Sequence, residues 1–443
     1  MLLFFAEENT ERLFYITDLL LRQLACVQTE ITTDKEVFKS YAGPKINYSA
    51  ERICVDEFNI KPHSLLFEED IQQHAIECFN KNGLKFFFKN EGDDLGFDVL
   101  AASFYVVTRY EEYLPYEEDE YGRYPYTNSL AYKEDFLHLP LVNIWATDLK
   151  NALKQKFSSF KISDNDFRFI PTYDIDIAFS FRSKGFIRSI GGWVKNFFNG
   201  EWTLLKKRIE VKRGKKQDPY DCYEWLDGLH ENLKLLPVYF FLVADRQTGF
   251  DKNISPANEE LGKLIKRHAE KYFVGVHPSW KSNESENILK KEIETMGQLS
   301  GSRKIVISRQ HYIKMKLPET YQRLINAGIE LDFSMGYGSV NGFRASIASP
   351  FKWFDITKNE LTGLTVYPFC FMDANSFYEL KQTPEQAYNE LRQLYSTVKK
   401  INGTFVTVWH NHFLGTDPQF IGWKEMYELF LREDLYWDFL EPA

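Results

Sequence analysis

The chain has 443 residues, of which 44% are hydrophobic and 26% are charged, and its net charge is −9 at pH 7. This length exceeds one ordinary core and predicts two domains, and the composition is that of a globular protein. The negative charge argues against nucleic acid as the main partner. No stretch of about 18 uncharged apolar residues occurs, so no membrane span is expected.

The five cysteines are scattered along the chain, and none of them forms a CxxC pair. An odd number of isolated thiols argues against a disulfide framework or a structural zinc site and fits a reducing compartment. The first eight residues contain two glutamates and lack both a basic region and a long apolar region, so they do not resemble a signal peptide. These features predict a cytoplasmic protein.

Residues 1–150 are predicted to form a separate α+β domain of unknown role. Leu13–Leu24 and Asp98–Tyr113 have the apolar periodicity of helices, and Leu84–Phe88 is a short strand-like run. An acidic, aromatic loop, Leu114–Tyr126, follows the second helix. The charged residues at the end of that helix are interpreted as solvated, with local ion pairs, and a functional role is the alternative. They are Arg109, Glu111 and Glu112.

Alternating strands and helices begin at about residue 165, which predicts a parallel sheet with right-handed crossovers. About seven strands suit a deformed (β/α) barrel over residues 165–443. A basic insertion at about 179–219 is interpreted as a solvated helical excursion, with a lid, a polyanion contact or an interfacial segment as alternatives. The expected strands are Phe167–Tyr173, Pro237–Val243, Tyr272–Val276, Lys304–Ile307, Ile329–Phe333, Thr365–Phe371 and Thr404–Val408. The expected helices are Tyr220–Leu235, Asn258–Lys271, Ser285–Leu299, Pro318–Ala327, Pro384–Lys400 and Trp423–Leu431.

Acidic, imidazole and guanidinium side chains stand at or just beyond the ends of most of these strands. A barrel of parallel strands gathers its active site at the carboxyl ends of the strands, so these side chains are expected to meet on one face. Such residue types bind a divalent metal and carry out acid and base catalysis. The segments are Thr172–Asp176, Val276–Trp280, Ser308–Tyr312, Phe371–Asp373 and Val408–His412.

Asp174 and Asp176 are two residues apart, so both side chains point to the same face of an extended strand. Two carboxylates this close repel each other unless a cation or a shared proton compensates. One carboxylate as metal ligand and the other as general base resolves the conflict. A structural aspartate beside a helix-capping one is the alternative.

Single imidazole and guanidinium groups follow two further strands. His277 is a candidate metal ligand or a hydrogen-bonded core histidine, and Ser279 is a candidate for capping a turn or binding substrate. Arg309 and His311 share a face if their strand continues. Arg309 is a candidate for a bidentate contact with a carboxylate, or a structural arginine, and His311 for metal or substrate binding.

Asp373 ends one strand, and His410 and His412 end the last one. A carboxylate beside an imidazole orients the ring and keeps it protonated, which is the usual arrangement of a general acid. His410 and His412 again share a face because they are two residues apart. Hydrogen-bonded residues at strand ends are the alternative for each of them.

The order and spacing of these segments resemble the polysaccharide deacetylase (NodB-homology) family, in a divergent two-domain subgroup. Its first motif, Thr-Phe-Asp-Asp-Gly, is similar to TYDID at 172–176, and its Arg-x-Pro-Tyr motif is similar to Arg309–Tyr312. Its His-Ser/Thr-x-x-His motif is matched only by His277, because Lys281 stands four residues later. The resemblance covers roughly residues 165–435.

The resemblance implies a metal-dependent hydrolase that removes an N- or O-linked acetyl group from a carbohydrate, with Zn²⁺ as the expected metal. It implies that Asp176 and His277 bind the metal and that Asp174 is the general base. We expect His311 to replace the missing histidine as the third ligand and Arg309 to orient Asp174.

The same resemblance implies that Asp373 orients His410, which then protonates the departing amine. His412 replaces His410 in this role if the strand faces the other way, and otherwise it binds substrate. The other expected substrate-binding residues are one serine and several aromatic residues that can stack on a sugar. They are Ser279, Trp280, Tyr312, Phe343 and Trp409. Core packing is the alternative for the aromatic residues and is favoured for at least half of them.

Two alternative functions remain open at this point. An amidase acting on a small nitrogenous substrate could use the same barrel, and a small, enclosed pocket would favour it. The chain could instead be a catalytically inactive carbohydrate-binding protein. The evidence for inactivity is Lys281, whose ammonium group could take the place of the metal's charge.

Overall fold

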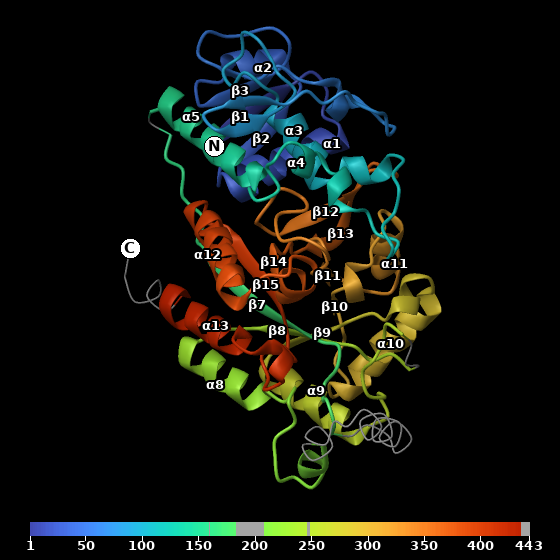
Figure 1. The fold of residues 1–443 in the computed structure, drawn as a ribbon. Helices are drawn as coiled ribbons and strands as arrows, with labels where there is room; N and C mark the ends of the chain where they lie inside the picture. Colours follow the sequence, from blue (N-terminus) through green and yellow to red (C-terminus); the bar gives the residue numbers. More distant parts are fainter. Residues whose placement is uncertain (159, 183–207, 246–248, 436–443) are drawn as a thin grey trace.

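The computed structural model describes residues 1–158, 160–182, 208–245 and 249–435. Two separate sheets of four and nine strands organise the chain (Figure 1). We call residues 1–158 the N-terminal region and the remainder the C-terminal region. The basic insertion expected at 179–219 falls largely on residues 183–207, which lie outside the described residues.

The N-terminal region contains the four-stranded sheet, in the order β2-β1-β3-β4, with every pair of strands parallel. Helices α1 (Glu11–Thr17) and α2 (Lys35–Ser40) connect successive strands. This sheet is therefore of the α/β type rather than the expected α+β type. Its strands are β1 (Leu2–Ala6), β2 (Thr29–Thr32), β3 (Lys45–Tyr48) and β4 (Phe58–Asn59).

The expected helix Asp98–Tyr113 is divided in the structure. It consists of α3 (Val99–Val107), which is capped by the Asp98 carboxylate, and a 3₁₀ turn over Tyr110–Tyr113. Arg109 separates the two parts with a left-handed φ of 57°. The other elements of this region include the π-helix η1 (Asp18–Leu24), the hairpin β5 (Phe79–Lys81) and β6 (Leu84–Phe86), and helices α4 (Leu130–Lys133) and α5 (Leu141–Lys156).

The C-terminal region contains the nine-stranded sheet, in the order β12-β13-β11-β10-β9-β8-β7-β15-β14. All pairs are parallel except β12 and β13, so the predicted α/β class with a mostly parallel sheet is confirmed. The strands are β7 (Arg168–Ile175), β8 (Val238–Phe241), β9 (Phe273–Val276), β10 (Ile307–Ser308), β11 (Leu331–Asp332), β12 (Phe351–Asp355), β13 (Glu360–Val366), β14 (Phe371–Met372) and β15 (Thr404–His410).

The sheet has two ends, and among the described residues no strand ladder closes it. The single strand expected over Thr365–Phe371 is divided between β13 and β14, which lie at different places in the strand order. The short segment between them bonds to β11 at its start and to β15 at its end. Tyr367 N–H donates to Asp332 O at 2.8 Å, and Cys370 N–H donates to Val406 O at 3.3 Å. A closed barrel of about seven strands is therefore not shown.

Helices flank the nine-stranded sheet in Figure 1 and alternate with its strands along the chain, as the sequence predicts. Their starts follow the sequence closely, because Asn258 and Thr383 cap two of them at the expected residues. The helices are α8 (Tyr223–Leu233), α9 (Glu259–Lys271), α10 (Glu286–Leu299), α11 (Glu319–Asn326), α12 (Pro384–Lys400) and α13 (Trp423–Leu429).

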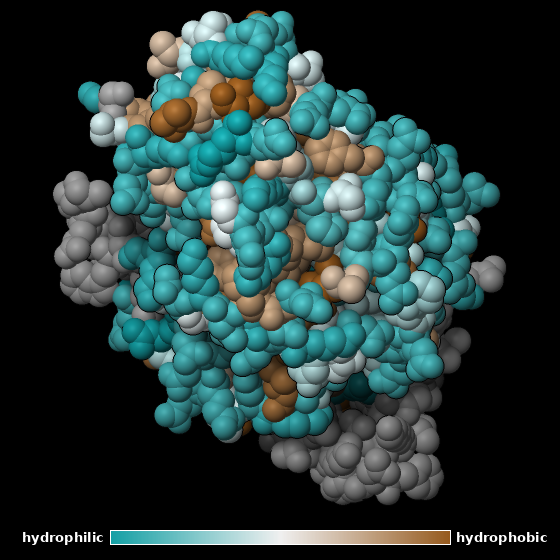
Figure 2. Space-filling model, turned by 90° about the horizontal axis from the view of Figure 1, so that it is seen from above, coloured by the Kyte–Doolittle hydropathy of each residue, from teal (hydrophilic) through white to brown (hydrophobic). Residues whose placement is uncertain are grey.

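The face of the molecule seen in Figure 2 is mostly hydrophilic, with small hydrophobic areas between the polar side chains. None of the described helices is long and apolar enough to span a membrane.

Buried ion pairs join the two regions. Both oxygens of Glu112 accept from Arg344, at 2.9 and 2.6 Å, and Oε1 also accepts from Arg109 Nε at 2.7 Å. Arg109 further donates to the Tyr337 hydroxyl at 3.1 Å and to the carbonyl of Arg344. The side chains of Arg109, Glu112 and Arg344 are each 1% exposed. The interpretation of this helix end as solvated is therefore wrong, because its charges are paired across an interface.

Candidate active site

The ends of neighbouring strands bring the predicted site residues to one edge of the nine-stranded sheet. β15, β7, β8, β9 and β10 lie side by side and parallel, so their carboxyl ends meet at the same edge. The side chains there line a cleft of about 460 Å³. The predicted residues in its lining are Asp174, Asp176, His277, His311, Tyr312, His410 and His412.

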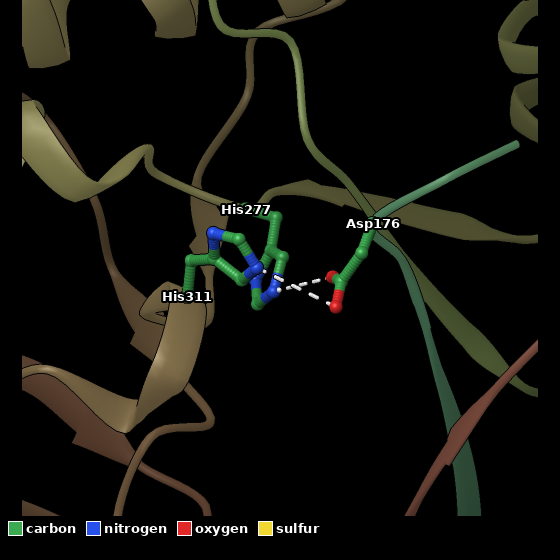
Figure 3. Close-up of side chains that lie close together, drawn as sticks. All are labelled: Asp176, His277 and His311. Atoms are coloured by element: carbon green, nitrogen blue, oxygen red, sulfur yellow. Dashed lines mark ion pairs between the residues drawn. The ribbon is translucent and has the colours of Figure 1, made fainter. Parts of the chain in front are cut away.

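Asp176, His277 and His311 form a cluster that could hold a metal ion (Figure 3). Oδ1 of Asp176 lies 3.1 Å from His277 Nε2, and Oδ2 lies 3.4 Å from His311 Nε2. One potential ligand atom from each residue lies within 4.8 Å of the others. Asp176 Oδ1 is buried without a hydrogen-bond partner in the described part of the chain. One carboxylate and two imidazoles are a donor set that suits Zn²⁺.

Hydrogen bonds fix the orientation of both histidine rings. His277 Nδ1 donates to the carbonyl of Arg309 at 2.6 Å, and His311 Nδ1 donates to Asp251 Oδ1 at 3.1 Å. Each ring thereby directs Nε2 at the cluster, as the histidine ligands of metal sites do. Burial alone would lower the pKa of His311, but Asp176 and Asp251 outweigh it and raise the pKa to about 9. A metal must therefore displace a proton from this ring.

Asp251 is a site residue that the sequence interpretation missed. Its carboxylate also accepts the backbone N–H of Trp280 at 3.0 Å, so it ties the segment after β9 to the one after β10. Asp251 follows β8, which lies between β7 and β9 in the sheet. Functional residues follow the ends of strands, and β8 is one of these strands. A search of the segment after β8 for carboxylates could therefore have identified Asp251 from the sequence.

Asp174 is held by a buried arginine. Arg309 Nη1 donates to Asp174 Oδ1 at 2.8 Å, and Arg309 Nε donates to the Phe333 carbonyl at 3.0 Å. The guanidinium group lies 4.4 Å from the centre of the Phe240 ring, and the side chain is 0% exposed. The other carboxylate oxygen, Oδ2, lies 3.8 Å from His277 Nε2 and therefore faces the metal cluster.

Asp373 and His410 form a buried pair on the opposite side of Asp176. His410 Nδ1 lies 2.6 Å from Asp373 Oδ1, and its backbone N–H donates to Asp373 Oδ2 at 2.7 Å. His410 Nε2 lies 3.6 Å from Asp176 Oδ2. Burial opposes the charged ring, but Asp373 outweighs it and raises the pKa of His410 to about 10. The ring can therefore donate a proton towards the metal cluster.

The substrate-binding residues expected from the sequence are only partly brought together. Tyr312 and His412 line the cleft. Trp280 is not among the lining residues, but its ring stacks on that of Phe250, which is, with centroids 3.9 Å apart. Trp409 is 0% exposed and packs on Tyr427 in the core, so its expected contact with a sugar is wrong. Adjacent strand residues face opposite sides, and His410 takes the side of the cleft.

Three further expectations differ from the structure. Phe343 is 2% exposed and belongs to the core. Ser279 is 4% exposed, its backbone N–H donates to Glu292, and it lines a separate cavity. Lys281 is exposed and lines that same cavity rather than the cleft. Its ammonium group is therefore not in the position of a metal ligand.

Several residues of the cleft lining were not expected from the sequence. Two of them, Tyr121 and Arg123, belong to the N-terminal region, which therefore contributes a wall of the cleft. The loop that carries them is acidic and aromatic, but nothing in its sequence indicates what it packs against. The other unexpected lining residues include Phe250, Lys252, Met372, Tyr378 and Glu379.

Comparison with known proteins assigns a family to part of the chain only. Residues 2–158 match the model of a family of unknown function (DUF7033), which covers the N-terminal region. No curated protein matches the chain significantly in sequence.

Solved structures offer weak similarities. A provisionally named polysaccharide deacetylase from Mycobacterium smegmatis is 15% identical, with a TM-score of 0.38 over 62% of this chain and 86% of that one. A similarly named protein from Pseudomonas aeruginosa PAO1 is 10% identical, with a TM-score of 0.36 over 60% and 83%. The allantoinase Puue is 9% identical, with a TM-score of 0.35 over 61% and 84%. TM-scores below 0.5 establish neither a shared fold nor a shared activity, so the function must be argued from the site.

Proposed function

We propose that the chain is a metal-dependent hydrolase that removes an acetyl group, N- or O-linked, from a carbohydrate. The observation that carries this proposal is the arrangement around Asp176. A three-residue metal cluster lies close to both an arginine-bound carboxylate, Asp174, and a carboxylate-bound imidazole, His410. Hydrolysis of an amide or ester needs a Lewis acid, a base for the attacking water and an acid for the leaving group, and these residues can supply all three.

Asp176, His277 and His311 would hold the metal. A bound Zn²⁺ polarises a carbonyl oxygen and lowers the pKa of a water molecule in its coordination shell. The three residues present their ligand atoms at the edge of the cleft, where an acetyl group can reach them. Asp251 and the Arg309 carbonyl hold the two rings in place, so that they need not reorganise on binding.

Asp174 acts as the general base. Arg309 occupies its Oδ1, which leaves Oδ2 directed at the cluster to take a proton from the attacking water.

His410 acts as the general acid. Asp373 holds Nδ1 and keeps the ring protonated, and Nε2 faces the cluster, where the leaving nitrogen or oxygen of the sugar develops negative charge. The geometry favours His410 over His412 in this role, because Asp373 holds the His410 ring, whereas Nδ1 of His412 has no hydrogen-bond partner in the described part of the chain.

The position of Lys281 bears on the inactive alternative. That interpretation requires the ammonium group of Lys281 to replace the metal's charge. Lys281 is exposed and lines another cavity, so it leaves the cluster of Asp176, His277 and His311 accessible to a metal.

Removal of the base should separate catalysis from metal binding. We expect Asp174→Asn to lower kcat for acetate release from N-acetylglucosamine oligomers by about 10²- to 10⁴-fold, because a positioned base contributes that much. Zinc content, measured by elemental analysis, should stay near that of the wild type. Asp164→Asn, a side chain that is 70% exposed, is the control. Hydrolysis of small amides without any acetate release from sugars would support the amidase alternative instead.

Removal of the acid should depend on the leaving group. We expect His410→Gln to lower kcat/KM for an N-acetylated sugar by about 10²-fold or more, because an amine leaves only after protonation. An aryl acetate should be affected far less, since a phenolate leaves without a proton. Steady-state kinetics with both substrates would test this. Equal losses on the two substrates would contradict the role of His410 as an acid.

A further inference from the structure

The turn Asp119–Arg123 of the N-terminal region is built to hold a fixed shape at the cleft. Gly122 N–H donates to the Asp119 carbonyl at 2.9 Å, and Gly122 has a φ of 71°. The Asp119 carboxylate accepts the backbone N–H groups of Tyr121 and Arg123, each at 2.9 Å. These bonds within the turn orient the side chains of Tyr121 and Arg123 towards the C-terminal region.

Arg123 connects this turn to the segment that carries His311. Its Nε donates to Asp119 Oδ2 at 2.7 Å, and its Nη1 donates to the backbone carbonyl of Tyr312 at 2.8 Å. The side chain is only 7% exposed. The guanidinium group also packs where residue 338 has no side chain, since a Cβ on Gly338 would lie 2.1 Å from Nη1. The C-terminal region therefore leaves room for this arginine.

The segment that Arg123 contacts has an unusual backbone. Tyr312 and Ile313 have φ values of 58° and 52°, so two consecutive residues with side chains adopt the left-handed conformation. Ile313 is β-branched, which makes this conformation particularly unfavourable. Such a backbone persists only when its surroundings hold it. The Tyr121 ring adds a second contact, because it stacks on the Tyr312 ring with centroids 5.6 Å apart.

We propose that Arg123 is a positioning residue for the metal ligand His311. Arg123 holds the carbonyl of Tyr312, the next residue, and thereby maintains the turn that directs His311 Nε2 at Asp176. The N-terminal region is then a necessary part of the metal centre rather than a separate module. This inference rests on the proposed metal site.

Buried contacts across the interface between the two regions support this role. The buried contacts of Arg109 and Glu112 with Arg344 fix the N-terminal region on the C-terminal region. The turn Asp119–Arg123 follows Glu112 closely in the chain, so it starts from an anchored point.

The test is the zinc affinity of full-length variants, measured by competition with a chelator. Arg123→Met keeps the apolar stem and removes the donors. We expect it to weaken zinc binding by about 10- to 100-fold, the usual effect of losing a partner that orients a ligand. Arg123→Lys keeps one charged donor and should restore part of the affinity. Arg52→Met is the control, because Arg52 is 42% exposed in an ion pair away from the cleft.

A double-mutant cycle distinguishes positioning from a general structural effect. With His311→Ala already in place, Arg123→Met should not weaken zinc binding further, because the ligand that it positions is gone. An unchanged affinity in Arg123→Met, or an equal loss in the His311→Ala background, would overturn the inference. Arg123→Lys can take the place of Arg123→Met in the cycle if the methionine variant does not fold.

The outcome is separable from that of the proposed function. A protein whose zinc affinity follows this pattern but which releases no acetate would contradict the deacetylase proposal and leave the role of Arg123 standing. Acetate release by the wild type, with an unchanged zinc affinity in Arg123→Met and Arg123→Lys, would contradict the role of Arg123 and leave the deacetylase proposal standing. A wild-type chain that binds no zinc would overturn both.

Discussion

Asp176→Asn is expected to weaken zinc binding by more than about 100-fold, because it removes the charged member of the ligand set. This loss exceeds the one expected for a residue that only orients a ligand. The two oxygens of Asp176 face His277 at 3.1 Å and His311 at 3.4 Å, so the carboxylate is shared by the whole cluster. An amide in its place offers one uncharged oxygen as a metal ligand, and its NH₂ group cannot bind the metal. Acetate release should be lost with the metal.

The measurement is elemental analysis of the purified variant, followed by chelator competition for any zinc that remains. Asp164→Asn again serves as the control, since Asp164 is exposed and lies outside the cleft. Near-stoichiometric zinc in Asp176→Asn would show that the cluster is not the metal site. A circular dichroism spectrum like that of the wild type would establish that the loss is local.

Glu112→Ala is expected to lower the free energy of unfolding by about 3–5 kcal/mol, the usual cost of removing one partner of a buried ion pair. Arg344 then has no carboxylate at its Nε and Nη2 atoms, and Arg109 loses one of two. The charges that remain are 1% exposed and cannot be hydrated without opening the interface.

Chemical denaturation of the metal-free protein would measure this change. Glu36→Ala, which removes an 80% exposed glutamate from a surface pair, should cost less than about 1 kcal/mol. Burial opposes ionisation of Glu112, but Arg344 and Arg109 outweigh it and lower its pKa. Its contribution is therefore present at neutral pH and is lost as the pH falls through the lowered pKa. A loss below 1 kcal/mol in Glu112→Ala would contradict the prediction.

Strand ends were the part of the site that the sequence could predict. Apolar runs identify β7, β9, β10 and β15, and parallel order brings the polar residues that follow them to one edge. The alternation of strand side chains correctly places Asp174 and Asp176 together in the lining of the cleft. The same rule, applied strictly, would have excluded Trp409, since its neighbour His410 faces the cleft.

Contacts between distant parts of the chain could not be predicted in this way. Arg123 lies 189 positions before Tyr312, and its partner there is a backbone carbonyl, which leaves no signature in side-chain pattern. The burial of Glu112 likewise depends on Arg344, which the sequence places in another domain. The strand expected over Thr365–Phe371 is divided in the structure because its two halves bond to different neighbouring strands. Local propensity does not determine which neighbour a strand pairs with.

The pairing of Glu112 with Arg344 spans 232 positions of the chain, and it limits how the protein can evolve. A substitution at either position leaves the other charged side chain buried without this partner. A lineage must therefore change both residues or keep both. Exchange of residues 1–158 for an unrelated domain by recombination would meet the same obstacle. We therefore expect descendants to inherit the two regions as one unit, with coordinated replacements at positions 112 and 344 marking the lineages in which the interface has been rebuilt.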